Sequence, residues 1–172
     1  AIGYNAGLGG DFGSSDINMT NNVAIGYGAM DGTGAIGTNQ NVFIGQDAGG
    51  GSWATAASNE NVGVGAFALN GAMNAAMRNT CLGTSAGQSI TTGDDNVCIG
   101  HDTGNTITTG SDNTYVGRKA TASGVGVTNE MALGHDAVGQ GTDTVAIGDG
   151  DVTAVYMADD SGAVVHCAGV NM

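Results

Sequence analysis

The chain has 172 residues, of which 33 are glycine and none is proline, and its formal net charge is −13. Glycine does not occupy every third position, which excludes a collagen helix, and so large a negative charge disfavours binding to nucleic acid or anionic lipid. No run of about 18 apolar residues is present, so we expect no membrane insertion. Val, Ile, Leu and Met recur at fixed places, which argues against disorder and leaves a regular, glycine-punctuated β structure.

A short motif recurs along the chain and is clearest over residues 96–104. It reads Asn, Val or Thr, a variable residue, an aliphatic residue, Gly, two variable residues, then Ala or Thr. Its spacing varies near the start and settles at 17 residues in the middle of the chain. A fixed motif at this period predicts stacked coils. We therefore predict an all-β fold, a parallel β-solenoid (β-roll) of about nine short coils. The motif glycines, which begin at Gly3, continue as Gly26, Gly45, Gly65, Gly83, Gly100, Gly117, Gly134 and Gly148.

Two columns of residues flank each motif glycine on its N-terminal side. An aliphatic residue such as Ile25 lies one position before the glycine, and Val, Thr or Met, as at Val23, lies three positions before it. Residues two apart on a strand share a face, so we expect both columns to point into the core. The column between them, which begins at Ala24, is small and often apolar. We expect it to face outward and to pack on another copy of the chain.

A third column, four positions before the glycine, consists of asparagine in most coils and is broken at Glu130 and Thr144. A row of amides could bind a ligand. It more readily forms a ladder at a corner of the solenoid, in which each side chain caps a turn and bonds to its neighbours. We predict this structural role for Asn22, Asn41, Asn61, Asn79, Asn96 and Asn113.

The segments between motifs predict turns and a second strand in each coil. Residues 89–95 and 106–112 are matched copies that read as a short β-branched strand followed by a glycine-led turn. Residues 69–78 are rich in good helix formers and could form a brief helical turn. After Gly148 the motif stops, and residues 151–158 and 163–170 read as a β-hairpin. We therefore divide the chain into a solenoid, residues 1–150, and a C-terminal capping hairpin, residues 151–172.

Residues with catalytic or metal-binding chemistry are sparse. His101 and His135 occupy the same slot, each followed by Asp, but about 10 Å of stack separates them, which favours a solvated surface column over a metal site. Cys81 and Cys98 occupy one slot in successive coils and read as small apolar fillers. Asp-rich turns, such as that at residues 94–95, could hold calcium weakly. We expect no enzyme activity, no catalytic residues, no cofactor and no dedicated metal site.

The motif over residues 22–29, with its variants through Ala137, resembles the head repeats of trimeric autotransporter adhesins (YadA-like), and it is equally similar to repeats of phage tail fibres. The resemblance covers roughly residues 1–150. It implies three chains side by side, each a left-handed roll, that together form an adhesive rod. Most coils here are longer than the compact head repeat, and the asparagine column is more prominent. The expected capping hairpin and the final residues 169–172 look more like the distal end of a phage fibre.

The expected function is therefore a homotrimeric phage tail-fibre or receptor-binding segment that attaches to a glycan or protein receptor on the host surface. Its expected location is the virion, or the extracellular cell surface for a bacterial adhesin head. A purely structural rod or filament subunit is an alternative from a different class. An ice-binding solenoid is a weaker one, because the threonine pairs that it would need span only two coils.

Overall fold

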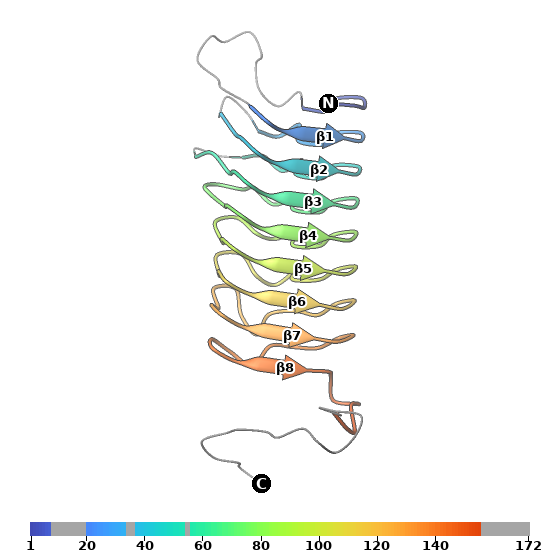
Figure 1. Cartoon of the computed structure of the whole chain (residues 1–172), viewed down its shortest axis with the longest axis vertical. Coiled ribbons are helices and arrows are strands. Elements are labelled where there is room, and N and C mark those ends of the chain that lie inside the picture. The colour runs from blue at the N-terminus through green and yellow to red at the C-terminus, as the bar shows by residue number, and fades with distance from the viewer. Residues whose placement is uncertain (8–19, 34–36, 54–55, 156–172) are drawn as a thin grey trace.

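The structure, a computed structural model, describes residues 1–7, 20–33, 37–53 and 56–155. These residues form a rod in which short strands stack along the long axis, with β1 at one end of the stack and β8 at the other (Figure 1). All strands belong to one parallel sheet and follow one another in sequence order. They are β1 (Val23–Ile25), β2 (Val42–Ile44), β3 (Val62–Val64), β4 (Thr80–Leu82), β5 (Val97–Ile99), β6 (Thr114–Val116), β7 (Met131–Leu133) and β8 (Val145–Ile147).

The predicted parallel β-solenoid is confirmed, and its register is the one that the motif sets. Each strand pairs with the same three slots of the next coil, as when Val97, Cys98 and Ile99 of β5 pair with β6. The strands number eight, so they bound seven complete turns, slightly fewer than the nine coils expected. The nine motifs include the first rung, where Ile2 adds only an isolated bridge to Ile25. The other eight motifs give the eight strands of the described residues, and eight strands bound seven turns.

The expectation about which face forms the core is wrong. The middle residue of each strand points inward: Phe43, Cys98 and Tyr115 are fully buried. The residues on either side of it point outward, and Ile99, for example, is 38% exposed. Alternation along a strand fixes only that neighbouring residues face opposite ways. Both faces here carry apolar residues, so alternation alone does not identify the inner one.

The interior is narrow and is filled by pairing large side chains with small ones. A Cβ at Gly63 would lie 2.8 Å from the Phe43 ring, and one at Gly49 would lie 2.7 Å from it. The ring of Trp53 packs edge-on against Phe43 with 5.9 Å between ring centroids. The small column therefore belongs inside, because a coil of this cross-section has room for one large side chain only where its neighbours are small, as Gly, Ala and Cys are.

The motif glycines stack directly on one another. At Gly100 the backbone φ is +136°, a region that side chains rarely adopt. A Cβ there would lie 2.5 Å from the carbonyl oxygen of Gly117 in the next coil. The same close approach recurs at most of the motif glycines, so the glycine is required by backbone conformation and by coil-to-coil spacing together.

Two smaller expectations are not met in the described residues, and a third, the capping hairpin, falls mostly outside them. Residues 89–92 and 106–109 form turns and bends, so these coils have one strand instead of two. These connections still bond from coil to coil, as from the Thr91 amide to the Thr108 carbonyl. Residues 69–78 contain no helical turn, because most of the hydrogen bonds that their backbone amides donate go to neighbouring coils, as from Asn74 to the Thr91 carbonyl. Residues 151–155 form no strand, and the rest of the expected hairpin lies outside the described residues.

Candidate functional site

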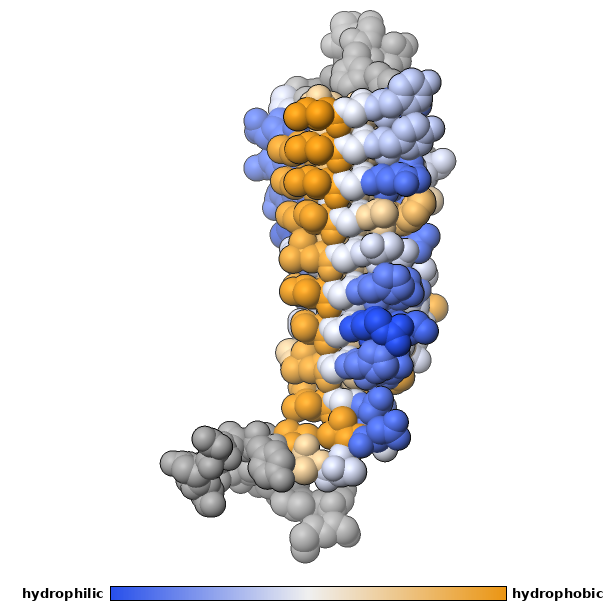
Figure 2. All heavy atoms as spheres, turned by 90° about the vertical axis from the view of Figure 1, so that its right-hand side faces the viewer, coloured by the Kyte–Doolittle hydropathy of each residue, from blue (hydrophilic) through white to orange (hydrophobic). Residues whose placement is uncertain are grey.

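The most prominent surface is an aliphatic band along the outer side of the sheet. We call it the outer stripe, and it consists of the first and third residues of β1 to β8: Val23, Ile25, Val42, Ile44, Val62, Val64, Thr80, Leu82, Val97, Ile99, Thr114, Val116, Met131, Leu133, Val145 and Ile147. None of these side chains is buried, and Val145 is 63% exposed. Figure 2 shows the stripe as a continuous orange band beside a pale column and a more hydrophilic one.

An exposed band of this length, in which only Thr80 and Thr114 are polar, is unusual on an isolated chain. With strands about 4.8 Å apart, eight rungs extend over about 34 Å, and no residue of the stripe carries a charge. Single exposed apolar residues need no explanation, but contiguous apolar patches of this extent mark surfaces that bind a partner. The residues of the stripe are the two columns that were expected to face the interior.

The asparagine column forms the ladder that its sequence pattern predicts. Asn96 is fully buried, and its Nδ2 donates to Asn79 Oδ1 at 2.9 Å and to the Gly110 carbonyl at 2.9 Å. Its Oδ1 accepts from the backbone nitrogen and the Nδ2 of Asn113, at 3.2 and 2.9 Å. The same pattern links Asn22, Asn41, Asn61, Asn79 and Asn113. These amides use their donors and acceptors on one another and on the backbone, so we assign them a structural role.

Glu130 follows the last asparagine of the ladder and lies at the centre of a separate hydrogen-bonded cluster. Its backbone nitrogen donates to Asn113 Oδ1 at 2.8 Å. Its carboxylate accepts from Tyr115 Oη at 2.8 Å, Ser123 Oγ at 2.6 Å and the Gly141 nitrogen at 2.7 Å. Burial alone would raise the pKa of this carboxyl, but the hydrogen bonds outweigh it and hold the pKa below its usual value. Burial, together with the bond to this carboxylate, also raises the pKa of Tyr115.

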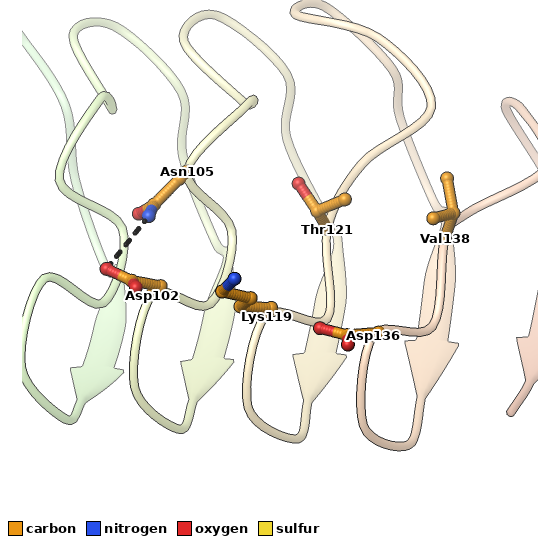
Figure 3. Close-up of a pocket in the computed structure, with 6 residues that line it drawn as sticks. All are labelled: Asp102, Asn105, Lys119, Thr121, Asp136 and Val138. Atoms are coloured by element: carbon orange, nitrogen blue, oxygen red, sulfur yellow. Dashed lines mark hydrogen bonds between the residues drawn. The ribbon is translucent and has the colours of Figure 1, made fainter. Parts of the chain in front are cut away.

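A polar groove runs along the rod where the chain turns after β5, β6 and β7. It has a volume of about 510 Å³ and opens to solvent. Figure 3 shows three of its side chains in a row at these turns and three more on the segments that face them. We call this hollow the polar groove. It is lined by Asp102, Asn105, Lys119, Thr121, Asp136 and Val138.

A row of histidine and arginine lies beside this groove, in the slot just after the motif glycine. His101 Nδ1 lies 3.0 Å from Asp102 Oδ2, and His135 Nε2 lies 3.3 Å from Asp136 Oδ2. Arg118 Nη2 approaches His135 Nε2 at 2.7 Å. Because a guanidinium can only donate, the ring nitrogen accepts this bond. The row is exposed, as the sequence predicts for a solvated column.

The cysteines occupy the interior. Cys81 and Cys98 face each other as direct partners of β4 and β5, and both are buried and free. Burial raises the pKa of the Cys81 thiol, which makes it a poor nucleophile. Of the aspartates in the expected calcium turn, Asp95 pairs with Arg78 at 2.7 Å and Asp94 accepts from the Met77 nitrogen.

Sequence reasoning missed three of these features. The outer stripe was missed because both strand faces are apolar. The Glu130 cluster was signalled by the break in the asparagine column, but its partners Ser123 and Gly141 follow no motif. The facing wall of the groove, Asn105, Thr121 and Val138, comes from connecting segments that carry no repeat signal.

Within the described ranges, no group of three or more His, Cys, Asp or Glu side chains is arranged to hold a metal ion. The same part of the chain contains no helix long and apolar enough to cross a membrane. Comparison of the chain with protein-family models, with curated proteins and with solved structures gives no match to any of them.

Proposed function

We propose that the chain is a segment of a homotrimeric fibre that attaches to a cell surface, and that the outer stripe joins its three copies. The observation that carries this proposal is the length of the uncovered aliphatic band. Burial of apolar surface contributes roughly 25 cal/mol per Å², so a band that runs along the whole rod strongly favours association. Identical chains carry identical bands, and a symmetric bundle covers all of them at once.

The choice of three copies rests on the sequence resemblance, and the choice of face rests on the packing. The small-residue column is inside each coil, so it cannot join the copies. The stripe is free for this purpose, because its side chains contribute little to the interior of a coil. A bundle of rods joined in this way leaves the loops and the hydrophilic columns on the outside, where a receptor can reach them.

The native mass in solution tests the assembly. Sedimentation equilibrium should give three times the mass of one chain. Ile99→Asp places a charge in the middle of the stripe and should reduce the mass to that of one chain, with the circular dichroism spectrum unchanged. Val125→Asp is the matched control, because Val125 is 57% exposed but lies outside the stripe. A monomeric parent chain, or an Ile99→Asp variant that stays trimeric, would contradict the proposal.

Attachment is tested separately on cells. The labelled parent protein should bind a subset of a panel of bacterial strains, and the monomeric Ile99→Asp variant should bind the same strains more weakly because it loses multivalency. A trimer that binds no strain would favour the purely structural rod.

A further inference from the structure

The positive charges of this chain are few, and most of them lie at the polar groove. The sequence has three Lys and Arg residues against sixteen Asp and Glu. Arg78 is neutralised by a two-point contact with Asp95, at 2.7 and 2.8 Å. The other two, Arg118 and Lys119, are adjacent and exposed. Neither forms a salt bridge with a carboxylate in the part of the chain that the structure describes.

The groove alternates acceptors and a donor along the rod. Asp102, Lys119 and Asp136 occupy the same slot of three successive coils, with left-handed φ values of 56°, 59° and 53°. Equal backbone conformation places the three side chains in a row at the strand spacing of about 4.8 Å (Figure 3). The ammonium lies between the two carboxylates without a salt bridge to either one. This arrangement disfavours a divalent cation, because the lysine would repel it.

Arg118 is held at the rim by its neighbour. Its Nη2 donates to His135 Nε2 at 2.7 Å, and that ring nitrogen lies 3.3 Å from the Asp136 carboxylate in the groove. The guanidinium is therefore anchored by one of its five donors, and the others remain for a ligand. A planar guanidinium with free parallel donors suits a carboxylate, which it can bind with two hydrogen bonds.

Asn105 contributes an unsatisfied amide on the opposite wall. Its Nδ2 makes one long hydrogen bond to Asp102 Oδ1, at 3.4 Å, and its Oδ1 is buried without a hydrogen-bond partner. A buried acceptor without a donor is unfavourable, because it has lost its hydrogen bonds to water and gained none in the protein. An amide held by one long bond can turn toward the groove, where a hydroxyl group would supply the missing donor.

The groove also extends beyond these residues. A second hollow of about 330 Å³ shares Asp136 and Val138 with it and continues toward Gln140 and Asp149. The hollows together follow the rod axis over several coils, which suits an extended chain better than a small compact molecule.

We propose that the polar groove binds an acidic polysaccharide, with a uronic acid carboxylate on Arg118 and sugar hydroxyls on Asp102, Lys119 and Asp136. A hydroxyl donates and accepts at once, so a row of carboxylate, ammonium and carboxylate matches successive hydroxyls. An acidic peptide of equal charge fits less well, because it has carboxylates for Arg118 but no hydroxyl groups to donate to Asp102 and Asp136. The inference rests on the proposed attachment function and names the chemistry of the receptor.

Isothermal titration calorimetry of the full chain tests this with tetragalacturonate and tetramannuronate. Maltotetraose serves as the neutral saccharide and tetraglutamate as the acidic peptide. We expect saturable binding of at least one uronate. Maltotetraose and tetraglutamate should each bind at least about tenfold more weakly than that uronate. Arg118→Gln and Lys119→Gln should each weaken uronate binding by about tenfold or more. Arg78→Gln removes one positive charge away from the groove and should change the affinity by less than about twofold.

Absence of binding to both uronates would overturn the proposal, and so would equal affinity for tetraglutamate or equal losses in all three variants. Native mass and attachment to cells are measured on the same proteins. Groove variants that lose no attachment, in a protein that remains trimeric and adhesive, would refute this inference and leave the proposed fibre function intact.

Discussion

The asparagine ladder predicts a specific loss of stability when one of its central rungs is removed. Asn96→Ala deletes four hydrogen bonds in a fully buried position, two donated by Nδ2 and two accepted by Oδ1. The backbone nitrogen of Asn113 then loses its partner in a place that water does not reach. At about 1 kcal/mol for each bond, we expect the free energy of unfolding to fall by about 4 kcal/mol.

Asn22→Ala is the matched control, because it changes the same residue type at the first rung of the ladder. Asn22 donates to the Thr38 carbonyl and accepts two bonds from Asn41, but it is only half-buried and water can replace these partners. We expect a loss of about 1–2 kcal/mol. Urea unfolding followed by circular dichroism, at one protein concentration, measures both. Equal losses at the two positions, or a loss below about 1 kcal/mol for Asn96→Ala, would refute the role assigned to the ladder.

Other predictions concern the glycine column, the Glu130 cluster and the buried thiols. Gly100→Ala should prevent folding or lower the melting temperature steeply, because its Cβ meets the Gly117 carbonyl at 2.5 Å, whereas Gly150→Ala, which meets nothing within 4 Å, should not. Glu130→Gln should cost about 2–3 kcal/mol at pH 7 in urea titrations. Because the folded pKa of Glu130 lies below the unfolded value of about 4.3, this advantage of the parent should be full at neutral pH and fade as the pH falls below that value. A constant difference down to pH 2 would contradict it. The thiol of Cys81 should resist alkylation in the folded protein and react in urea, as located by peptide mass mapping.

The sequence predicts the period, the parallel register and the asparagine ladder, because all three depend on residues that recur at fixed spacing. Asn96 lies where the motif places it, and Val97 pairs with the residue that the motif aligns with it. A repeat determines register well, because any other alignment would break every rung at once.

Which side of the strand is inside could not be predicted from alternation. The deciding factor is the volume available in a narrow coil, which depends on how Phe43 meets Gly63 of the next coil and Gly49 of its own. Similarly, the hydrogen-bond partners of the Glu130 carboxylate, Ser123 and Gly141, lie in irregular connecting segments. Asn105, which lines the groove, lies in another connecting segment. Contacts between connecting segments follow from three-dimensional packing, and no periodic signal in the sequence records them.

The three-residue strands have a consequence for how such a protein can evolve. In Val97–Cys98–Ile99 the middle residue fills the interior, while its two neighbours face outward. Substitutions at the outer positions can therefore alter what the rod associates with while the packing of each coil stays the same. Substitutions at the middle position act in the opposite way. Natural selection can thus adjust folding and association almost independently, although the residues that determine them are adjacent in the sequence.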